Sequence, residues 1–252
     1  MKQDYYELSA IQRYPIGFKY PSKNPLELRS WYYGKAGGAL DTNFGAKSVV
    51  PQIVNFATIN APMAQGGVLL AIDVALTDGV LGDGVIGEDE LAGGYCTVFT
   101  PAPMQSLNRR IVANTATTGA GGVTVMVVRL DKPLTLDVVV LNFHAECMAN
   151  PYVDVQTGNF TLASVVGVPT VPATLALPYL WLQTWGPIWI NPSVDEGVGA
   201  DNRRVVFLGN GGIGAWINAD PLRERCQNAG FVLPNLRTGA EGAPFIFLQI
   251  TP

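Results

Sequence analysis

The sequence predicts an all-β protein made of β-sandwich or β-barrel modules, with an extended N-terminal arm and few short helices. Short runs rich in β-branched and aromatic residues recur along the chain, with turn residues between them at close intervals. The 252 residues include 28 glycines and 18 prolines, which interrupt helices. Amphipathic helical segments of ten or more residues, which βαβ units require between strands, are almost absent.

Residues 1–25 have the composition of an extended arm. Aromatic side chains are interleaved with basic ones, and Pro15, Pro21 and Pro25 prevent a long helix. Aromatic residues and arginine commonly anchor protein interfaces. We therefore expect the arm and the strand after it to contact a partner, through Tyr5, Tyr6, Arg13, Tyr14, Phe18, Lys19, Tyr20 and Trp31.

Two β modules can be delimited after the arm and its lead-in, which together span 1–48. The first module spans 49–150 and the second 151–252. The pentapeptide NRRIV at 108–112 recurs as NRRVV at 202–206, which favours two modules in tandem. A single continuous β fold fits the sequence equally well.

Three tryptophans, Trp181, Trp185 and Trp189, gather in the segment LPYLWLQTWGPIWINP at 177–192. The Gly-Pro pair in its middle excludes a continuous helix, so we expect a strand over 178–185, a corner, and a short strand over 188–191. Each tryptophan buries a large apolar area, on the order of 150–250 Å². We expect the three to form a core or a contact between subunits.

The C-terminal part contains the one fair helix candidate, at 221–230. Pro221 suits a first helical turn, Asp220 precedes it and Gly230 would end the helix. The chain then closes with the hydrophobic run GAPFIFLQITP, which we expect to form a buried final strand.

Charge is sparse and unevenly distributed. Charged residues make up 14% of the chain, against roughly 25% in ordinary soluble domains. Residues 1–47 carry seven bases and four acids, whereas residues 48–108 carry six acids and no base. This split would let the basic lead segment dock on an acidic neighbour or on another copy, although ordinary surface solubility explains it equally well. Aromatic and basic residues also occur together on nucleic-acid platforms, but the net charge of −4 disfavours such a partner.

Motifs that carry chemistry are incomplete. The acids between Asp78 and Glu90 lack the ligand spacing of a calcium loop. His144 and Glu146 begin a zinc-deaminase signature whose second half is missing, and His144 is the only histidine. A nucleophilic pair of Cys147 with His144 requires side chains that face each other, which this spacing does not ensure. We expect no metal, no cofactor and no enzymatic activity.

The glycine-rich run GNGGIG at 209–214 matches a dinucleotide fingerprint only in part. It follows a predicted strand, but Asp220-Pro221 interrupts the helix that should come next, and no acid lies about 20 residues further on. We expect a tight loop.

The three cysteines, Cys96, Cys147 and Cys226, do not form a disulfide framework and are best interpreted as buried thiols in a reducing compartment. The N-terminus lacks the apolar core of a signal peptide, and no apolar stretch approaches the roughly 18 residues of a membrane span. We expect synthesis in a cytoplasm and no membrane partner.

The layout of the whole chain resembles a family of tailed-phage virion proteins, the capsid decoration or cement proteins. The resemblance is carried by a pattern of glycines, aromatics and strands that includes WYYGKAGGALDTNFGAK, GGYCTVFTPAPMQSLNRRIVANT, HAECMANPYVDV and AGFVLPNLRTGAEGAPFIFLQITP. It spans about 17–252. It implies a head-surface protein that docks on the major capsid protein, often as a homotrimer, and it implies no catalytic residues.

We therefore expect a structural protein on the capsid surface that binds the major capsid protein and stabilises the head. Deletion of residues 1–25 should weaken that binding and leave the β core folded. A different hypothesis is a virion-surface module for host recognition or glycan binding, with Trp181, Trp185 or Trp189 as the sugar platform. Exposed tryptophans would favour it.

Overall fold

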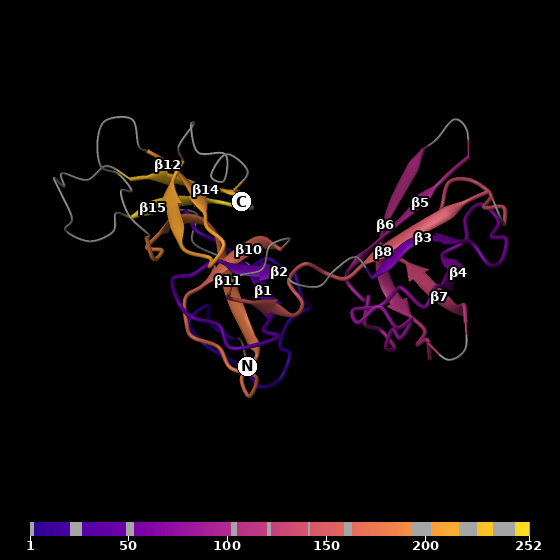
Figure 1. Cartoon of the computed structure of the whole chain (residues 1–252), viewed down its shortest axis with the longest axis horizontal. Coiled ribbons are helices and arrows are strands. Elements are labelled where there is room, and N and C mark those ends of the chain that lie inside the picture. Colours follow the sequence, from indigo (N-terminus) through magenta and orange to yellow (C-terminus); the bar gives the residue numbers. More distant parts are fainter. Residues whose placement is uncertain are drawn as a thin grey trace. The chain divides into compact units, whose positions relative to one another are not determined.

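The computed structural model describes residues 3–20, 27–48, 53–101, 105–119, 122–140, 142–158, 163–192, 203–216, 226–233 and 245–251 (Figure 1). Every regular element in these residues is a β-strand, and the strands form two curled antiparallel sheets, which confirms the all-β prediction. The expected short helices do not occur in this part of the chain. Of the helix candidate at 221–230, residues 221–225 lie outside the described residues, and the rest lead into strand β14 (Asn228–Val232).

The chain divides into two compact units. The inserted unit is Val50–Asn150, and the discontinuous unit combines Met1–Val49 with Pro151–Pro252. Residues 1–48 therefore do not form a separate arm and lead-in. They contribute β1 (Ser30–Lys35) and β2 (Ala46–Ser48) to the sheet of the discontinuous unit, and several of their aromatic side chains, Trp31 and Tyr33 above all, are buried with Trp181 from the C-terminal part of the chain.

The sheet of the discontinuous unit has nine strands in the order β13-β12-β14-β15-β11-β10-β2-β9, with β1 also paired to β11. Its other strands are β9 (Val155–Gln156), β10 (Ser164–Pro169), β11 (Tyr179–Ile188), β12 (Arg204–Phe207), β13 (Ile213–Ala215) and β15 (Ile246–Gln249). The first half of β11 pairs with β1 and β10, and its second half pairs with β15. Strand β11 thus joins the N-terminal and C-terminal segments of this unit.

Strand β11 does not turn at Gly186-Pro187, so the predicted corner between two short strands is wrong. Gly186 has a φ of +93°, and a β-carbon there would lie 2.6 Å from the carbonyl oxygen of Leu28. The side-chain amide of Gln183 donates to the carbonyls of Trp185 (3.1 Å) and Pro187 (3.0 Å), which stabilises the distorted stretch. Strand β11 therefore continues through Gly186-Pro187 with a locally distorted backbone. A proline excludes a helix interior but is tolerated in a strand where its missing N–H is not needed.

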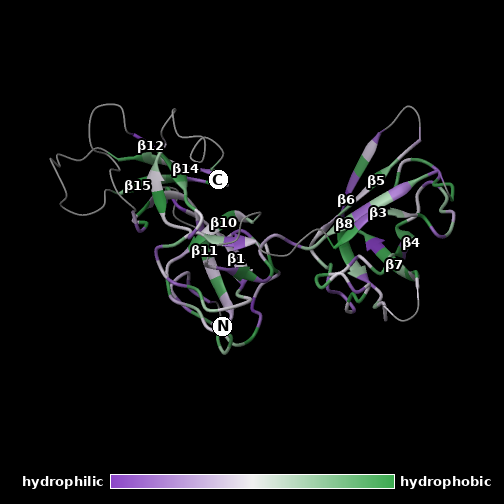
Figure 2. Ribbon diagram, in the orientation of Figure 1, coloured by the Kyte–Doolittle hydropathy of each residue, from purple (hydrophilic) through white to green (hydrophobic). Residues whose placement is uncertain are grey.

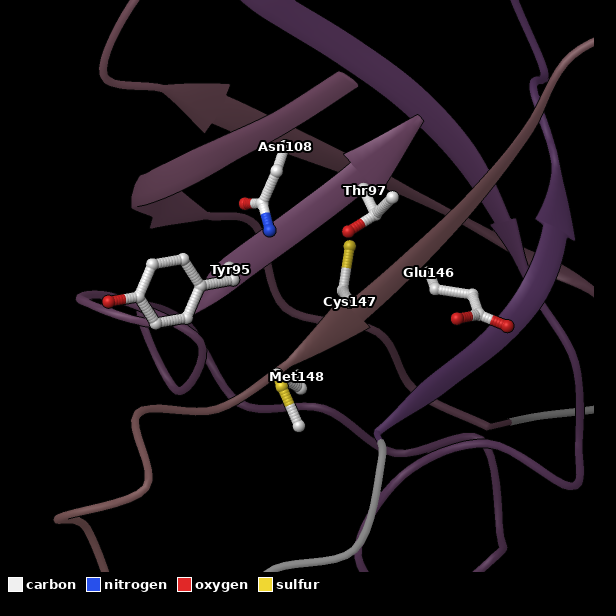
Figure 3. Close-up of a pocket in the computed structure, with 6 residues that line it drawn as sticks. All are labelled: Tyr95, Thr97, Asn108, Glu146, Cys147 and Met148. Carbon is white, nitrogen blue, oxygen red and sulfur yellow. The ribbon is translucent and has the colours of Figure 1, made fainter. Parts of the chain in front are cut away.

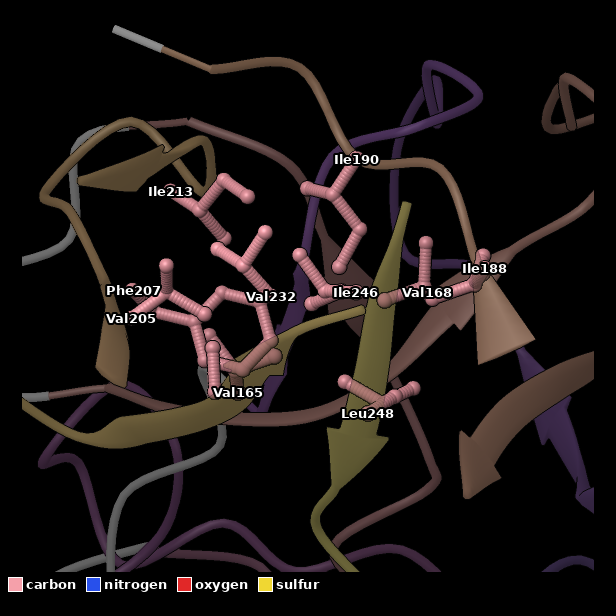
Figure 4. Packing of buried hydrophobic residues seen from close by; sticks show 11 residues of the cluster. Val165, Val168, Ile188, Ile190, Val205, Phe207, Ile213, Val232, Ile246 and Leu248 are labelled. Carbon is pink, nitrogen blue, oxygen red and sulfur yellow. The ribbon is translucent and has the colours of Figure 1, made fainter. Parts of the chain in front are cut away.

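The described residues of the discontinuous unit form three core clusters. The largest cluster lies between β10, the end of β11 and β12 to β15, and Figure 4 shows its side chains pointing toward one another. A second cluster surrounds Leu180 and Leu182, and an aromatic one surrounds Trp31, Tyr33 and Trp181. Apolar and polar stretches alternate along the strands of both units (Figure 2), as expected for sheets with one buried face. The predicted final strand is β15, which buries Ile246 and Leu248.

The inserted unit is a six-stranded sheet in the order β3-β8-β5-β6-β7-β4. Its strands are β3 (Val54–Thr58), β4 (Leu69–Val74), β5 (Tyr95–Phe99), β6 (Ser106–Asn114), β7 (Thr124–Leu130) and β8 (His144–Met148). The sheet curls until its two edges meet, because Ile59, just after β3, forms a β-bridge with Ile72 of β4. Alternate side chains fill the interior, as in β4, where Leu70, Ile72 and Val74 are fully buried.

The two NRR segments occupy different positions in these sheets. Asn108–Val112 lies in β6, between its sequence neighbours β5 and β7. Arg204–Val206 lies in β12, between β13 and β14, while Asn202 is outside the described residues. The shared pentapeptide therefore does not mark a common strand order.

Candidate interaction surfaces

Residues 3–20, which we call the strap, are fastened to β1 and β11 by backbone hydrogen bonds. Ser9 and Tyr179 exchange N–H···O bonds of 3.0 and 3.1 Å. Tyr20 donates to the carbonyl of Trp31 (2.8 Å), and Tyr33 donates to that of Phe18 (2.9 Å). The strap is thus part of the discontinuous unit. The remainder of the expected arm, residues 1–2 and 21–25, lies outside the described residues.

Gln3 fixes the start of the strap inside the unit. Its side chain is buried, accepts a hydrogen bond from the Tyr33 hydroxyl (2.7 Å) and donates to the Tyr179 carbonyl (2.9 Å). Its backbone carbonyl accepts from Nε1 of Trp181 (3.2 Å). Since buried polar groups need partners, these bonds specify where the segment lies. No motif in the sequence marked this glutamine, because its role depends on two residues far along the chain.

The inner side of the strap completes an aromatic core. Tyr5 stacks on Trp31 at a centroid distance of 4.4 Å, and Tyr14 and Tyr20 pack on Trp181 at 5.1 and 5.0 Å. Burial is the main cause that raises the pKa of Tyr20. Four of the eight residues expected at a partner interface, namely Tyr5, Tyr14, Tyr20 and Trp31, therefore face the interior of their own unit.

The guanidinium of Arg29 packs on two rings of this aromatic core, those of Tyr5 and Trp31. Its guanidinium carbon lies 5.0 Å from the Trp31 ring centroid, and its Nε contacts the Glu27 carboxylate at 2.8 Å. The hydrogen bond to Glu27 is the main cause that raises the pKa of Arg29, and the same bond lowers the pKa of Glu27. Arginine stacked on an aromatic ring is an established stabilising contact, so this cation belongs to the scaffold.

The outer side of the strap presents the other four expected residues, Tyr6, Arg13, Phe18 and Lys19, all of which are exposed. Ile11, which sequence reasoning missed, is 64% exposed in the same segment. Exposed apolar residues and bases on a rigid support are suited to contact with a partner. We call these five residues the strap surface.

A second aromatic array crosses the sheet of the discontinuous unit. Trp185 of β11 meets Phe247 of β15 edge-on at 5.5 Å, and Phe247 stacks on Phe231 of β14 at 5.4 Å. Arg204 of β12 lies opposite Phe231 and stacks on Trp216 at 4.9 Å. These rings pack mainly on one another. Trp181, in contrast, is fully buried and Trp189 is half-buried.

A shallow hollow of about 270 Å³ lies on the inserted unit, lined by residues of β5, β6 and β8, namely Tyr95, Thr97, Asn108, Glu146, Cys147 and Met148 (Figure 3). The pairing of the three strands places Glu146, Thr97 and Asn108 in one row across the sheet. Tyr95 and Met148 form the next row and are 44% and 47% exposed. A carboxylate, a hydroxyl and an amide beside an aromatic ring can bind a small polar ligand.

Phe56 lies on the same barrel, in an irregular stretch of β3. The register between β3 and β8 shifts between Val54 and Ala57, and Phe56 has a φ of +45°, which is rare for a residue with a side chain. Its ring stacks on the His144 imidazole at 4.2 Å and remains half exposed. A backbone conformation of this kind persists only where its surroundings enforce it.

The structure separates the Cys147–His144 pair and places no helix directly after the glycine-rich run. Residues of β8 alternate, so His144 and Glu146 point to one face of the strand while the buried Cys147 points to the other. The run at 209–214 is a turn in which Leu208 and Gly212 share a backbone hydrogen bond of 2.8 Å, and it leads directly into β13, not into a helix. The expected tight loop is therefore confirmed.

Asp78, Asp83, Asp89 and Glu90 accept hydrogen bonds from backbone amides. The buried Asp78 carboxylate accepts from the N–H groups of Asn55 and Ala75 at 3.1 and 2.8 Å, and Glu90 accepts from Gly87 at 2.6 Å. Within the described ranges, no three His, Cys, Asp or Glu side chains gather as metal ligands would.

No helix in the described part of the chain is both long and apolar enough to span a membrane. The chain matches no family model, and neither a curated protein nor a solved structure is significantly similar to it.

Proposed function

We propose that this chain is a non-enzymatic virion protein of a tailed phage, which decorates the head by binding the major capsid protein and itself, as a homotrimer. The resemblance of its sequence to capsid decoration proteins suggests this role. The main structural support is the strap surface, since Tyr6, Ile11 and Phe18 are exposed on the same segment as Arg13 and Lys19.

The mechanism rests on burial of this strip against an acidic neighbour. The aromatic core holds the strap in place before binding, so little conformational entropy is lost when a partner covers it. Burial of apolar side chains contributes roughly 25 cal/mol per Å², and the two bases add electrostatic complementarity. A protein that covers a junction between capsomers in this way resists their separation.

Substitution on the strap surface tests the proposal better than deletion of residues 1–25. Deletion would remove Gln3 and half of the aromatic core, so loss of binding could follow from unfolding. Ile11→Asp with Arg13→Glu instead changes two exposed side chains. On heads that lack the protein, this double variant should bind at least about tenfold more weakly, a change of about 1.4 kcal/mol.

The matched control is Leu175→Asp, which places a charge at another exposed apolar position of the same unit. It should bind like the unchanged protein, and both variants should keep the wild-type melting temperature. Equal occupancy of the heads by the double variant and the control would reject the strap surface as the binding site.

The hollow on the inserted unit supports a second candidate, recognition of a glycan. No hydrogen bond among the described residues occupies the side chains of Glu146, Thr97 or Asn108, so all three can bind sugar hydroxyls while Tyr95 stacks on the ring. This site is a better candidate than Trp181, which is buried, or Trp185, whose ring packs on Phe247; Trp189 of the expected tryptophan platform is half-buried.

Calorimetric titration with a panel of neutral oligosaccharides tests this candidate. Binding should be lost in both Glu146→Gln and Tyr95→Ala and kept in Val125→Ala, an exposed position on another strand of the same barrel. If no sugar of the panel binds, or if binding survives both substitutions, the hollow is not a glycan site.

A further inference from the structure

Two of the three cysteines face each other inside the barrel of the inserted unit. Cys96 of β5 and Cys147 of β8 are direct partners in the antiparallel register. Both thiols are free and fully buried. The third cysteine, Cys226, belongs to the discontinuous unit and is only half-buried. The sequence gives no sign of this pairing, because 96 and 147 have no recognisable spacing.

The backbone hydrogen bonds show that the pair is of the non-hydrogen-bonded type. The carbonyl of Cys147 accepts from Ile53 (3.2 Å), on the β3 side of β8 and away from β5. On β5, the carbonyl of Gly94 accepts from Ile111 of β6 (2.8 Å), so the backbone of Cys96, two residues further, also points toward β6. Neither cysteine therefore directs its backbone polar groups at the other.

This type of pair brings side chains closest together. In a non-hydrogen-bonded antiparallel pair the Cα atoms lie about 4.5 Å apart, inside the roughly 4.4–6.8 Å range that disulfides span. The two side chains already contact each other, because the hydrogen bond between Cys147 and Cys96 is the largest cause that raises the pKa of Cys147. Burial adds to the same increase.

We propose that Cys96 and Cys147 form a modification site, at which a cross-strand disulfide joins β5 to β8 when the chain meets a small-molecule disulfide such as oxidised glutathione. The thiolate of one cysteine attacks the glutathione disulfide and releases one glutathione. The thiol of the other cysteine loses its proton and attacks the mixed disulfide, which releases the second glutathione. Two cysteine thiols are oxidised, one disulfide is reduced, and the two protons pass to the released glutathione thiolates.

The native barrel controls when this exchange occurs. Exchange requires a thiolate and access to it, and the buried pair offers neither while the barrel is closed. The disulfide therefore forms during folding or when the barrel opens locally, and it is then protected from reductants. The inference does not depend on the proposed function, although a virion protein would meet an oxidising medium after release from the cell.

The test is to unfold the reduced full-length chain and refold it in an oxidising glutathione buffer. Three proteins are compared, namely the unchanged chain, Cys226→Ala, which keeps the pair, and Cys147→Ala, which removes it. Refolded Cys226→Ala should contain no titratable thiol, should lose the mass of two hydrogen atoms, and should yield one cross-linked peptide joining positions 96 and 147. Its melting temperature should exceed that of the reduced form by on the order of 10 °C.

Cys147→Ala serves as the negative control and should show no melting-temperature difference between oxidising and reducing buffers. Several results would overturn the proposal. These are two free thiols in refolded Cys226→Ala, glutathione retained on Cys96 or Cys147, or a cross-link to Cys226 in the unchanged chain. A disulfide that lowers the melting temperature would also overturn it, because it would show that the native register cannot accommodate the bond.

Discussion

The indole nitrogen of Trp181 donates a 3.2 Å hydrogen bond to the backbone carbonyl of Gln3, although 178 residues separate the two along the chain. The bond ties the first described residue to the central strand of the discontinuous unit. Together with the bond from the Tyr33 hydroxyl to the Gln3 side chain, it explains why an aromatic-rich N-terminal segment packs on its own unit.

Gln3→Ala should lower the free energy of unfolding by about 1–3 kcal/mol, since it leaves the buried Tyr33 hydroxyl proton without its acceptor. The control is Gln12→Ala, an exposed position of the same segment, which should change stability by less than about 0.5 kcal/mol. Urea unfolding followed by tryptophan fluorescence measures both. Equal effects of the two substitutions would show that Gln3 does not fasten the strap.

Gly186→Ala should destabilise the discontinuous unit by more than about 2 kcal/mol. The new β-carbon would combine an unfavourable φ of +93° with a contact of 2.6 Å to the Leu28 carbonyl. Gly66→Ala is the comparison, because φ there is +88° but no atom lies within 4 Å, so only the conformational cost of about 1 kcal/mol applies. Thermal unfolding distinguishes them, and identical melting temperatures would contradict the steric argument.

Phe56 provides a test of backbone strain in β3. Phe56→Gly should be more stable than Phe56→Ala by about 1 kcal/mol, because both lose the stacking on His144 but only glycine adopts a φ of +45° without cost. In a regular strand the order is reversed, since glycine is the weaker strand former. Chemical denaturation shows which of the two variants has the higher free energy of unfolding. A more stable alanine variant would mean that the backbone at this residue is not strained.

Lys47 should make stability depend on pH in the alkaline range. Its ammonium group is buried and donates to the carbonyls of Gly158 and Gly209. Burial lowers the pKa of Lys47 below its ordinary value of 10.5, and the nearby Cys226 opposes the change. Between the folded pKa and 10.5 the unfolded chain binds more protons than the folded one, so the free energy of unfolding rises with pH in that window.

Comparison with Lys47→Met isolates this effect from other alkaline titrations. The stability of the unchanged protein relative to the variant should increase as the pH is raised toward 10.5, as measured by urea unfolding at several pH values. Parallel pH profiles for the two proteins would show that the proton affinity of Lys47 is the same in the folded and unfolded chains.

The fold class could be predicted from the sequence, because glycine and proline exclude long helices and β-branched runs form strands wherever they are buried. Which of the N-terminal aromatic side chains are buried and which are exposed could not be predicted. Tyr5 and Tyr6 are adjacent and chemically identical, yet one stacks on Trp31 and the other is exposed. Composition alone cannot distinguish a surface that binds a partner from one that completes the chain's own core.

The remaining errors also have local causes. The corner predicted at Gly186-Pro187 follows a sound rule for helices, but Pro187 lies opposite Phe247 in a strand that continues. The row of Glu146, Thr97 and Asn108 depends on the register of three strands, and no motif within one segment encodes it. Sequence patterns report which face of a strand is buried, whereas a site on a sheet depends on which strands are neighbours.

The discontinuous unit is built from two separate stretches of the chain, and this has a consequence for its folding during synthesis. Residues 50–150 contain every strand of the barrel, so that unit has all its partners once it leaves the ribosome. In the discontinuous unit, residues 1–49 lack their strand and core partners until β11 and finally β15 have been translated. Contacts between such distant parts of the chain form slowly. If translation halts before residue 246, the inserted unit is complete but the discontinuous unit lacks β15. Its aromatic and aliphatic side chains then remain exposed, so that it can bind chaperones or aggregate.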